Sequence, residues 1–162
     1  MLPEFDHEMK VTRSLLDRVP EDRATWQPHK KSMTMGELAI HLPSLVGWVP
    51  AIIGQGELNM NPPGGPPYAP SKFTTSAELL STFDEAVDAA RRALAAAEDA
   101  ALMVPWSLKT GEHTIFTMPR VAVLRGFIVN HIIHHRGQLS VYLRLNDIPV
   151  PDIYGPTADS KR

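Results

Sequence analysis

The sequence contains no cysteine among its 162 residues. Disulfide bonds, thiolate metal sites and cysteine nucleophiles are therefore excluded, and any metal ion must be held by histidine, aspartate or glutamate. An excess of one charge is also missing, because the basic and acidic residues nearly balance at a net charge of −2. A nearly neutral protein gives no reason to expect nucleic acid or an anionic membrane as a partner.

Long hydrophobic runs are absent as well. No stretch approaches the ~18 uninterrupted apolar residues expected of a membrane span, and residues 1–6 lack the basic and apolar parts of a signal peptide. We therefore expect a cytoplasmic protein. The composition, 43% hydrophobic and 21% charged, is ordinary for a globular chain. Its length predicts a single domain that covers residues 1–162.

Four segments of the chain have the apolar spacing of amphipathic helices. Two of them begin at a Thr-x-x-Glu pattern, Thr34 to Glu37 and Thr75 to Glu78, which is typical of a helix capping box. The predicted helices begin near residue 3, at residue 32 or 34, at residue 74 or 75, and at residue 119. They end near residues 19, 49, 102 and 145.

Two connections between these helices are distinctive. Residues 54–70 are rich in proline and glycine, which predicts a long connection without regular structure. Residues 106–118 contain the turn residues Thr110 and Gly111 between two apolar stretches, which indicates a short hairpin or an extended excursion. Four helices with one long connection between the second and the third predict an all-α fold, a four-helix bundle with a long crossover.

Three histidines lie on apolar helix faces. His131 and His135 are four residues apart, so their side chains share one face of the fourth helix with Phe127 and Ile128. His41 shares a face of the second helix with several apolar residues. A buried imidazole without a partner costs about 1–3 kcal/mol, and one metal ion can satisfy several imidazoles at once. The pattern therefore predicts a metal site formed by His41, His131 and His135.

His134 is the alternative ligand on the fourth helix, because it could pair with His131 at a spacing of three residues. It lies about 60° away from the direction of His131, which favours His135. Gln138 and Tyr142 continue the face of His131 and are expected to orient a ring or a bound water. Arg136 is expected on a flank of the helix that reaches water.

Three neutral imidazoles with one open coordination position are typical of catalytic rather than structural metal sites. Zn(II) or Ni(II) is the expected ion, with Fe(II), Co(II) and Mn(II) as alternatives, since Mg(II) and Ca(II) prefer oxygen ligands. No glutamate directly follows His131, so the general base of a zinc peptidase is missing. His7, on the first helix, is expected to be solvated.

These features together resemble the DinB/YfiT-like superfamily. The resemblance is carried by Trp26-Gln27-Pro28, by the helix start Met35 to Leu42, by the segment Asn130 to Leu139, and by the tail Pro151 to Pro156. It covers nearly the whole chain. The most specific part is the His-x-x-x-His-Arg-Gly-Gln segment, together with one histidine upstream.

The resemblance implies a four-helix bundle, often a homodimer, in which the family's three metal-binding histidines match His41, His131 and His135. Relatives with a known reaction include bacillithiol S-transferases and the mycothiol-dependent maleylpyruvate isomerase, in which the metal activates a low-molecular-weight thiol. We therefore expect a metal-dependent thiol S-transferase, or a related hydrolase or isomerase, that acts on a small-molecule substrate. The alternative is a non-catalytic, stress-related bundle that binds a metal or a ligand.

A pocket that opens onto the metal would distinguish an enzyme or a ligand-binding protein from a bundle without a ligand. We expect such a pocket beside Trp48, under the connection of residues 54–70.

Overall fold

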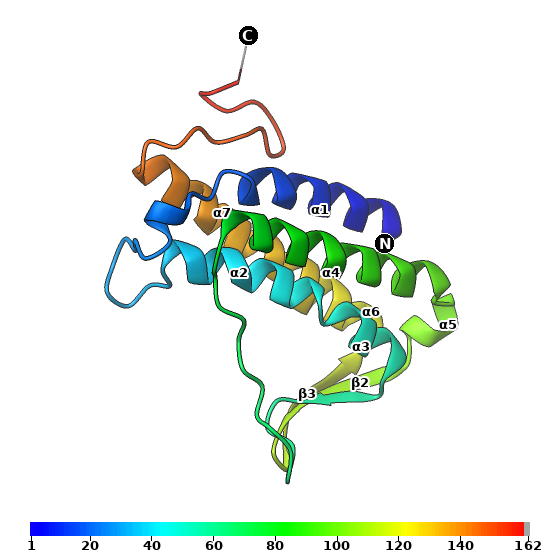
Figure 1. Cartoon of the computed structure of the whole chain (residues 1–162). Helices are drawn as coiled ribbons and strands as arrows, with labels where there is room; N and C mark the ends of the chain where they lie inside the picture. The colour runs from blue at the N-terminus through cyan, green and yellow to red at the C-terminus, as the bar shows by residue number, and fades with distance from the viewer. Residues whose placement is uncertain (161–162) are drawn as a thin grey trace.

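Four long helices dominate the computed structural model, which describes residues 1–160. They are α1 (Leu2–Leu16), α2 (Met35–Val46), α4 (Ser76–Ala96) and α7 (Asn130–Leu145). In the bundle, α1 and α2 each pack against both α4 and α7 (Figure 1). Because α2 and α4 run in the same direction, the chain has to return along the bundle between them (Figure 1). The predicted long crossover is therefore present.

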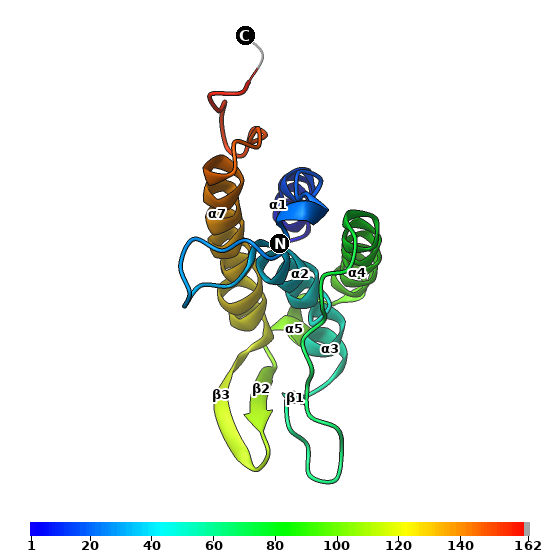
Figure 2. The same cartoon turned by 60° about the vertical axis from the view of Figure 1, so that its left-hand side comes forward.

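A small sheet at one end of the bundle corrects the prediction of an all-α fold (Figure 2). The strands β2 (Pro105–Thr110) and β3 (His113–Pro119) form an antiparallel hairpin. This hairpin agrees with the predicted turn at Thr110 and Gly111. Gly111 adopts a φ of 60°, a conformation that glycine reaches without the steric cost of a Cβ atom.

The third strand, β1 (Glu57–Asn59), pairs in parallel with β2. It contradicts the expectation that residues 54–70 are without regular structure. The Asn59 side chain holds this strand against the hairpin, since its amide nitrogen donates to the Gly111 carbonyl over 2.8 Å and its amide oxygen accepts from the Gly111 nitrogen over 3.0 Å. Three residues are too few for a period-two pattern to reveal a strand.

Local capping determines where two of the helices begin. The Thr34 hydroxyl accepts from the Glu37 nitrogen over 3.2 Å, and the Glu37 carboxylate accepts from the Thr34 nitrogen over 2.8 Å. This capping box satisfies two backbone donors that have no partner within the helix. The Thr75 hydroxyl caps α4 by accepting from the Glu78 nitrogen over 3.1 Å, but the Glu78 carboxylate accepts from the Thr74 hydroxyl, so α4 has a one-sided cap and not the predicted capping box. Both predicted starts are confirmed.

Short helices complete the chain. The 3₁₀ turn η1 (Glu21–Arg23) lies between α1 and α2, and α3 (Val49–Gly54) follows α2 directly. The predicted third helix is divided into α4 and the short α5 (Asp99–Leu102). The predicted fourth helix consists of α6 (Arg120–Ala122), the π-helical segment η2 (Val123–Val129) and α7.

The π-helical segment changes which residues of the fourth helix face the core. A π-helix takes more residues per turn than an α-helix, so a single rotation of 100° per residue over residues 121–145 gives the wrong relation between the apolar face before residue 130 and the buried face of α7. The buried residues of α7 are Ile132, Arg136, Leu139, Tyr142 and Leu143. The prediction that Arg136 reaches water is therefore wrong.

Arg136 is 1% exposed and forms an ion pair with the buried Glu8 of α1 over 2.6 Å. Its guanidinium also donates to the Glu8 carbonyl over 3.1 Å and to the hydroxyl of Tyr154 over 2.5 Å. The Tyr154 hydroxyl in turn donates to the Glu8 carboxylate over 2.9 Å. The pair thus joins α1, α7 and the C-terminal tail.

One stretch of the described residues, Met35–Gly54 across α2 and α3, is long and apolar enough to cross a membrane. Its 18-residue window has a mean hydropathy of 1.4, and 56% of that window is buried inside the protein. Core helices meet the same criterion, so length and composition alone are weak evidence for a membrane span.

We predict that Glu8→Ala lowers the free energy of unfolding by about 3–5 kcal/mol, because it leaves the guanidinium of Arg136 buried without its counter-charge. Asp84→Ala is the matched control. Its pair with Arg13 is 2.7 Å long, but the two side chains are 45% and 47% exposed, so its loss costs less than about 1 kcal/mol. Urea unfolding followed by circular dichroism measures both values. Equal losses in the two variants would contradict the role of the buried pair.

Candidate metal centre

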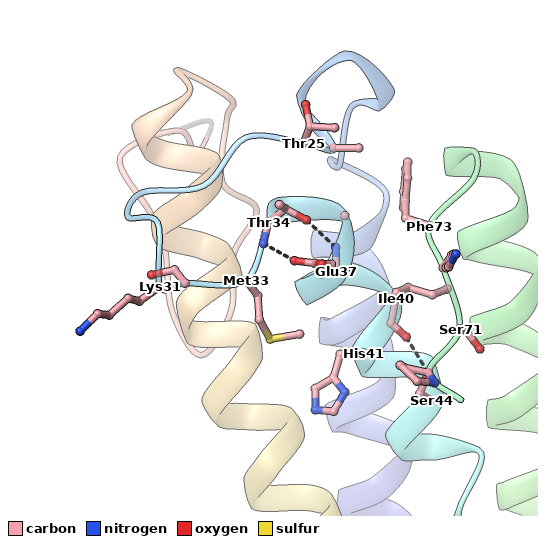
Figure 3. A pocket seen from close by; sticks show the side chains of 15 residues that line it. Thr25, Lys31, Met33, Thr34, Glu37, Ile40, His41, Ser44, Ser71 and Phe73 are labelled. Atoms are coloured by element: carbon pink, nitrogen blue, oxygen red, sulfur yellow. Dashed lines mark hydrogen bonds between the residues drawn. The ribbon is translucent and has the colours of Figure 1, made fainter. Parts of the chain in front are cut away.

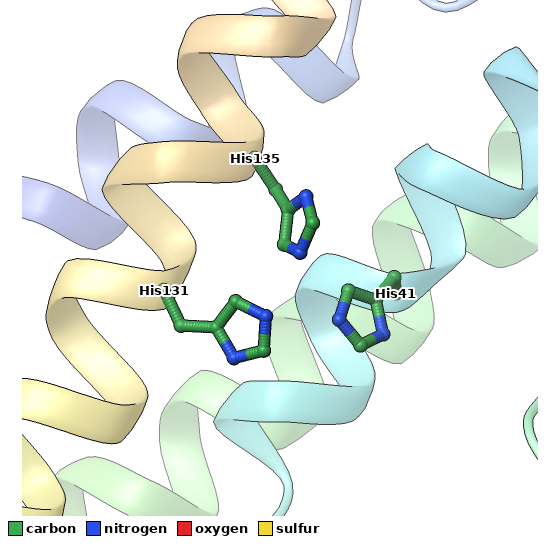
Figure 4. A group of neighbouring side chains, drawn as sticks. All are labelled: His41, His131 and His135. Atoms are coloured by element: carbon green, nitrogen blue, oxygen red, sulfur yellow. The ribbon is translucent and has the colours of Figure 1, made fainter. Parts of the chain in front are cut away.

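Three histidine side chains converge between α2 and α7 (Figure 4). His41 extends from α2, whereas His131 and His135 extend from successive turns of α7. The ring centroids are 5.2 Å apart for His41 and His131, 4.8 Å for His41 and His135, and 4.6 Å for His131 and His135. The structure therefore brings together the three residues that the sequence singled out. Two of them lie one turn apart on α7, and the third lies on the neighbouring helix α2.

The donor set suits a divalent metal ion. One nitrogen from each ring can be chosen so that all three lie within 4.8 Å of one another. Nitrogen ligands about 2.0–2.1 Å from one tetrahedral Zn(II) ion lie about 3.4 Å apart, a spacing that small rotations of the side chains can reach. The three rings are half-buried, and this cluster of the described residues contains no carboxylate. Imidazole nitrogens alone suit Zn(II), Ni(II), Co(II) and Fe(II).

The surroundings keep these imidazoles neutral, which is the form that binds a metal. Burial, followed by the charges of His135 and His131, lowers the pKa of His41 to about 4. Burial also lowers the pKa of His131 and of His135, and neighbouring histidines add to both shifts. The hydrogen bond of His131 to the Phe127 backbone acts to raise the pKa of His131. The hydrogen bond of His135 to Gln138 acts to raise the pKa of His135.

Gln138 orients the ring of His135. The Nδ1 atom of His135 lies 2.7 Å from the Oε1 atom of Gln138. Because an amide oxygen only accepts hydrogen bonds, Nδ1 carries the proton in this contact and Nε2 retains its lone pair. The predicted role of Gln138 as a residue that orients a histidine ring is consistent with this contact.

Tyr142 does not take the role predicted for it. Its hydroxyl donates to the carbonyl of Met33 over 3.3 Å, and its ring packs edge-on against Trp26 with centroids 5.4 Å apart. It therefore anchors the connector before α2 and does not orient a histidine. Sequence periodicity predicted the correct face of the helix for Tyr142. It could not predict which residues Tyr142 contacts, because Tyr142 lies about two turns beyond the histidines.

The two remaining histidines of interest lie outside the cluster. His134 is exposed and does not belong to the group of convergent nitrogens, although its ring lies 4.9 Å from that of His135. His7 is exposed, as expected, and stacks on Tyr154 with ring centroids 6.3 Å apart.

Aromatic side chains cover the site on the side of the C-terminal end of α2. The Phe127 ring lies 5.6 Å from that of His131, and Trp48 stacks on Phe127 with centroids 5.9 Å apart. Tyr68 from the long connection contacts Trp48 edge-on at 5.8 Å. Tyr68 therefore covers Trp48 on this side of the site.

A pocket of about 620 Å³ opens onto His41 from the side of the N-terminal end of α2 (Figure 3). Its walls are the connector before α2, the first turns of α2 and residues 70–73. Trp48 is not among its lining residues, so the expected location of the pocket is wrong. The sequence carried no signal for it, because residues 70–73 are far in the chain from the connector and from α2, and only the fold brings these walls together.

The family model of the DinB superfamily matches residues 4–139, a range that includes all three histidines of the cluster. The helical bundle with its histidine cluster is therefore a member of the DinB superfamily. The protein YrdA of Bacillus subtilis (strain 168), itself uncharacterised, is 26% identical over 163 residues, which cover 98% of this chain and 88% of YrdA.

Two solved structures have the same fold. The DinB-like protein YjoA from Bacillus subtilis is 19% identical with a TM-score of 0.71, and the match covers 96% of this chain and 98% of YjoA. A DinB-like protein from Bacillus cereus ATCC 10987 is 22% identical with a TM-score of 0.70, and the match covers 94% and 95% of the two chains. These similarities concern the fold.

We predict that Gln138→Leu weakens Zn(II) binding about 10- to 100-fold, because the His135 ring loses the partner that fixes its tautomer. His134→Leu, an apolar substitution of an exposed neighbour outside the cluster, should leave the affinity unchanged. Calorimetric titration of metal-free protein with Zn(II) measures both. An unchanged affinity in Gln138→Leu, or an equal loss in His134→Leu, would overturn this role of Gln138.

Proposed function

We propose that the protein is a metal-dependent enzyme in which His41, His131 and His135 hold one divalent ion, Zn(II) or Ni(II), with Fe(II), Co(II) and Mn(II) as alternatives. The observation that carries this proposal is the convergence of three half-buried imidazoles with lowered pKa values between two helices. Structural histidines in a core are usually satisfied one at a time by hydrogen bonds. Three that face one another leave a common point for a cation.

The proposed reaction is the transfer of a low-molecular-weight thiol to a small electrophilic substrate, or a related hydrolysis or isomerisation. A divalent ion with an exchangeable position lowers the pKa of a coordinated thiol or water, so that a nucleophile forms at neutral pH. The chain has no cysteine, so the thiol has to come from a small molecule.

In this proposal, residues of the chain orient the histidine rings and exclude water from one side of the site. Gln138 fixes the His135 ring through Nδ1 and thereby directs Nε2 into the cluster. Phe127 and Trp48 form an apolar cover on one side of the histidines. The pocket at His41 provides the open side, from which a ligand reaches the cluster.

A non-catalytic, stress-related metal- or ligand-binding protein is the second candidate, and one observation favours it. Glu37 is the sole carboxylate that lines the pocket within residues 1–160. Its Oε2 atom already accepts the Thr34 nitrogen of the capping box. No other carboxylate in this lining is available as a general base, which is expected of a site that binds without catalysis.

The homodimer implied by the family resemblance remains part of this proposal. The outer face of α7 supports it, since Val141 and Leu145 are 55% and 57% exposed there. Exposed aliphatic side chains one turn apart are the kind of surface that a second copy would cover.

The test is thiol transfer to 1-chloro-2,4-dinitrobenzene by protein reconstituted with Zn(II) or Ni(II). In this reaction the thiolate sulfur bonds to the ring carbon, chloride leaves, and the thiol proton passes to the buffer. We expect turnover of glutathione, cysteine or a related thiol in the metal-loaded protein, loss of it in His41→Ala, and retention in His134→Ala.

Calorimetry with the same thiols separates the two candidates. Thiol binding that requires the metal, without transfer, would favour the non-catalytic protein. If the metal changed neither thiol binding nor transfer, the thiol-dependent function would be contradicted.

A further inference from the structure

The pocket at His41 has the size of a small-molecule site. Its volume of about 620 Å³ lies within the range of about 300–1,000 Å³ typical of such sites. A second hollow shares Ile40, Ser71 and Lys72 with it and continues towards α4. The pocket therefore has room for an organic molecule with one or two rings that reaches from the surface to His41.

Close backbone contacts hold the walls of the pocket in place. The connector is tied to α2 by hydrogen bonds from the Met35 nitrogen to the Trp26 carbonyl and from the Gly36 nitrogen to the Ala24 carbonyl, each 2.8 Å long. A Cβ atom on Gly36 would lie 3.1 Å from both the Ala24 carbonyl and the Phe73 side chain. Glycine at this position lets Phe73 approach the start of α2, so the pocket is built into the fold.

The surface between these walls is mainly apolar. Met33 of the connector, Ile40 of α2 and Phe73 line the pocket (Figure 3). The half-buried hydroxyls of Thr34 and Ser44 already form hydrogen bonds within the protein, with the Glu37 nitrogen and the Ile40 carbonyl respectively. An apolar body is therefore the part of a ligand that these walls recognise.

The charges around the pocket cancel. Lys31 and Lys72 line the pocket, but Lys31 is exposed and its side chain is directed away from the pocket (Figure 3). Glu37 lines the pocket as well, and Glu78 lines the adjoining hollow together with Lys72. Two glutamates thus match two lysines, and no net charge of either sign selects an ion. A charged group between the apolar walls would lose hydration without gaining a counter-charge, which is unfavourable.

We infer that this pocket binds an uncharged molecule with an apolar body, which lies between Met33 and Phe73 and has one end at His41. In the proposed reaction this molecule is the electrophilic substrate, and the inference rests on the proposed function in that respect alone. The substrate class is then an uncharged aromatic or branched aliphatic electrophile. The preference for an uncharged body depends on the pocket walls, whether or not the histidines hold a metal ion.

N-phenyl-1-naphthylamine tests where such a molecule binds. This probe is uncharged and its fluorescence rises in apolar surroundings, so metal-free protein can be titrated directly. Phe73→Ala should weaken binding about four- to fifteenfold, the effect of withdrawing one or two methylene groups from contact. Phe73→Leu keeps an apolar wall and should bind nearly as tightly as the parent. Val141→Ala removes an exposed aliphatic side chain that does not line the pocket and should leave the affinity unchanged.

A second variant is needed because Phe73 also packs against the hydrophobic core. Ser71 lines the pocket and is exposed, so Ser71→Trp fills the pocket from its outer wall and should abolish binding of the probe. Circular dichroism checks that each variant is folded. Probe binding that is unchanged in both Phe73→Ala and Ser71→Trp, or that is lost in Val141→Ala, would overturn the pocket assignment.

Displacement of the probe from metal-free protein tests the charge preference. Naphthalene-1-acetamide is uncharged, whereas naphthalene-1-acetate is an anion and 1-naphthylmethylamine is a cation at neutral pH. All three have the same aromatic body. We expect the acetamide to displace the probe at a several-fold lower concentration than either ion. An anion or a cation that displaces the probe as effectively as the acetamide would overturn the preference for an uncharged ligand.

Thiol transfer by Zn(II)-loaded protein separates this inference from the proposed function. If the pocket variants lose the probe but the loaded parent transfers no thiol to 1-chloro-2,4-dinitrobenzene, the pocket assignment holds and the proposed function fails. If the parent and Ser71→Trp transfer the thiol to this uncharged substrate equally well, the pocket assignment fails and the proposed function stands.

Discussion

The buried ion pair of Arg136 and Glu8 fixes the rotation of α7, and the histidine cluster depends on that rotation. Successive residues of an α-helix are turned by about 100°, so when Arg136 faces α1, the preceding His135 faces another neighbour, which is α2. Apolar contacts alone tolerate a range of rotations. A buried charge does not, because leaving it unpaired costs several kcal/mol. The pair thereby selects the rotation that turns His131 and His135 towards His41.

This orientation gives the cluster two unlike sides. Towards the C-terminal end of α2, Phe127 and Trp48 cover the imidazoles with apolar surface. Towards its N-terminal end, the pocket leads from the surface to His41. A site closed on one side and open on the other defines the direction from which a ligand arrives.

The sequence predicted the three histidines because each depends on local geometry. The spacing of His131 and His135 lies within a regular α-helix, and the capping box sets the start of the helix that carries His41. The burial of Arg136 could not be predicted, because a π-helical segment shifts the periodicity before it and its partner Glu8 lies in the first helix. The same holds for β1 and the pocket walls, which are formed by contacts between distant segments.

Metal content tests the central claim most directly, namely that His41, His131 and His135 form one metal site. Protein incubated with Zn(II) or Ni(II) and then dialysed is compared by elemental analysis with two double variants, His131→Ala/His135→Ala and the exposed control pair His113→Ala/His134→Ala. We predict about one equivalent of metal in the parent and in the control, as for a single site, and none in His131→Ala/His135→Ala. A parent without metal, or equal metal in all three proteins, would contradict the claim.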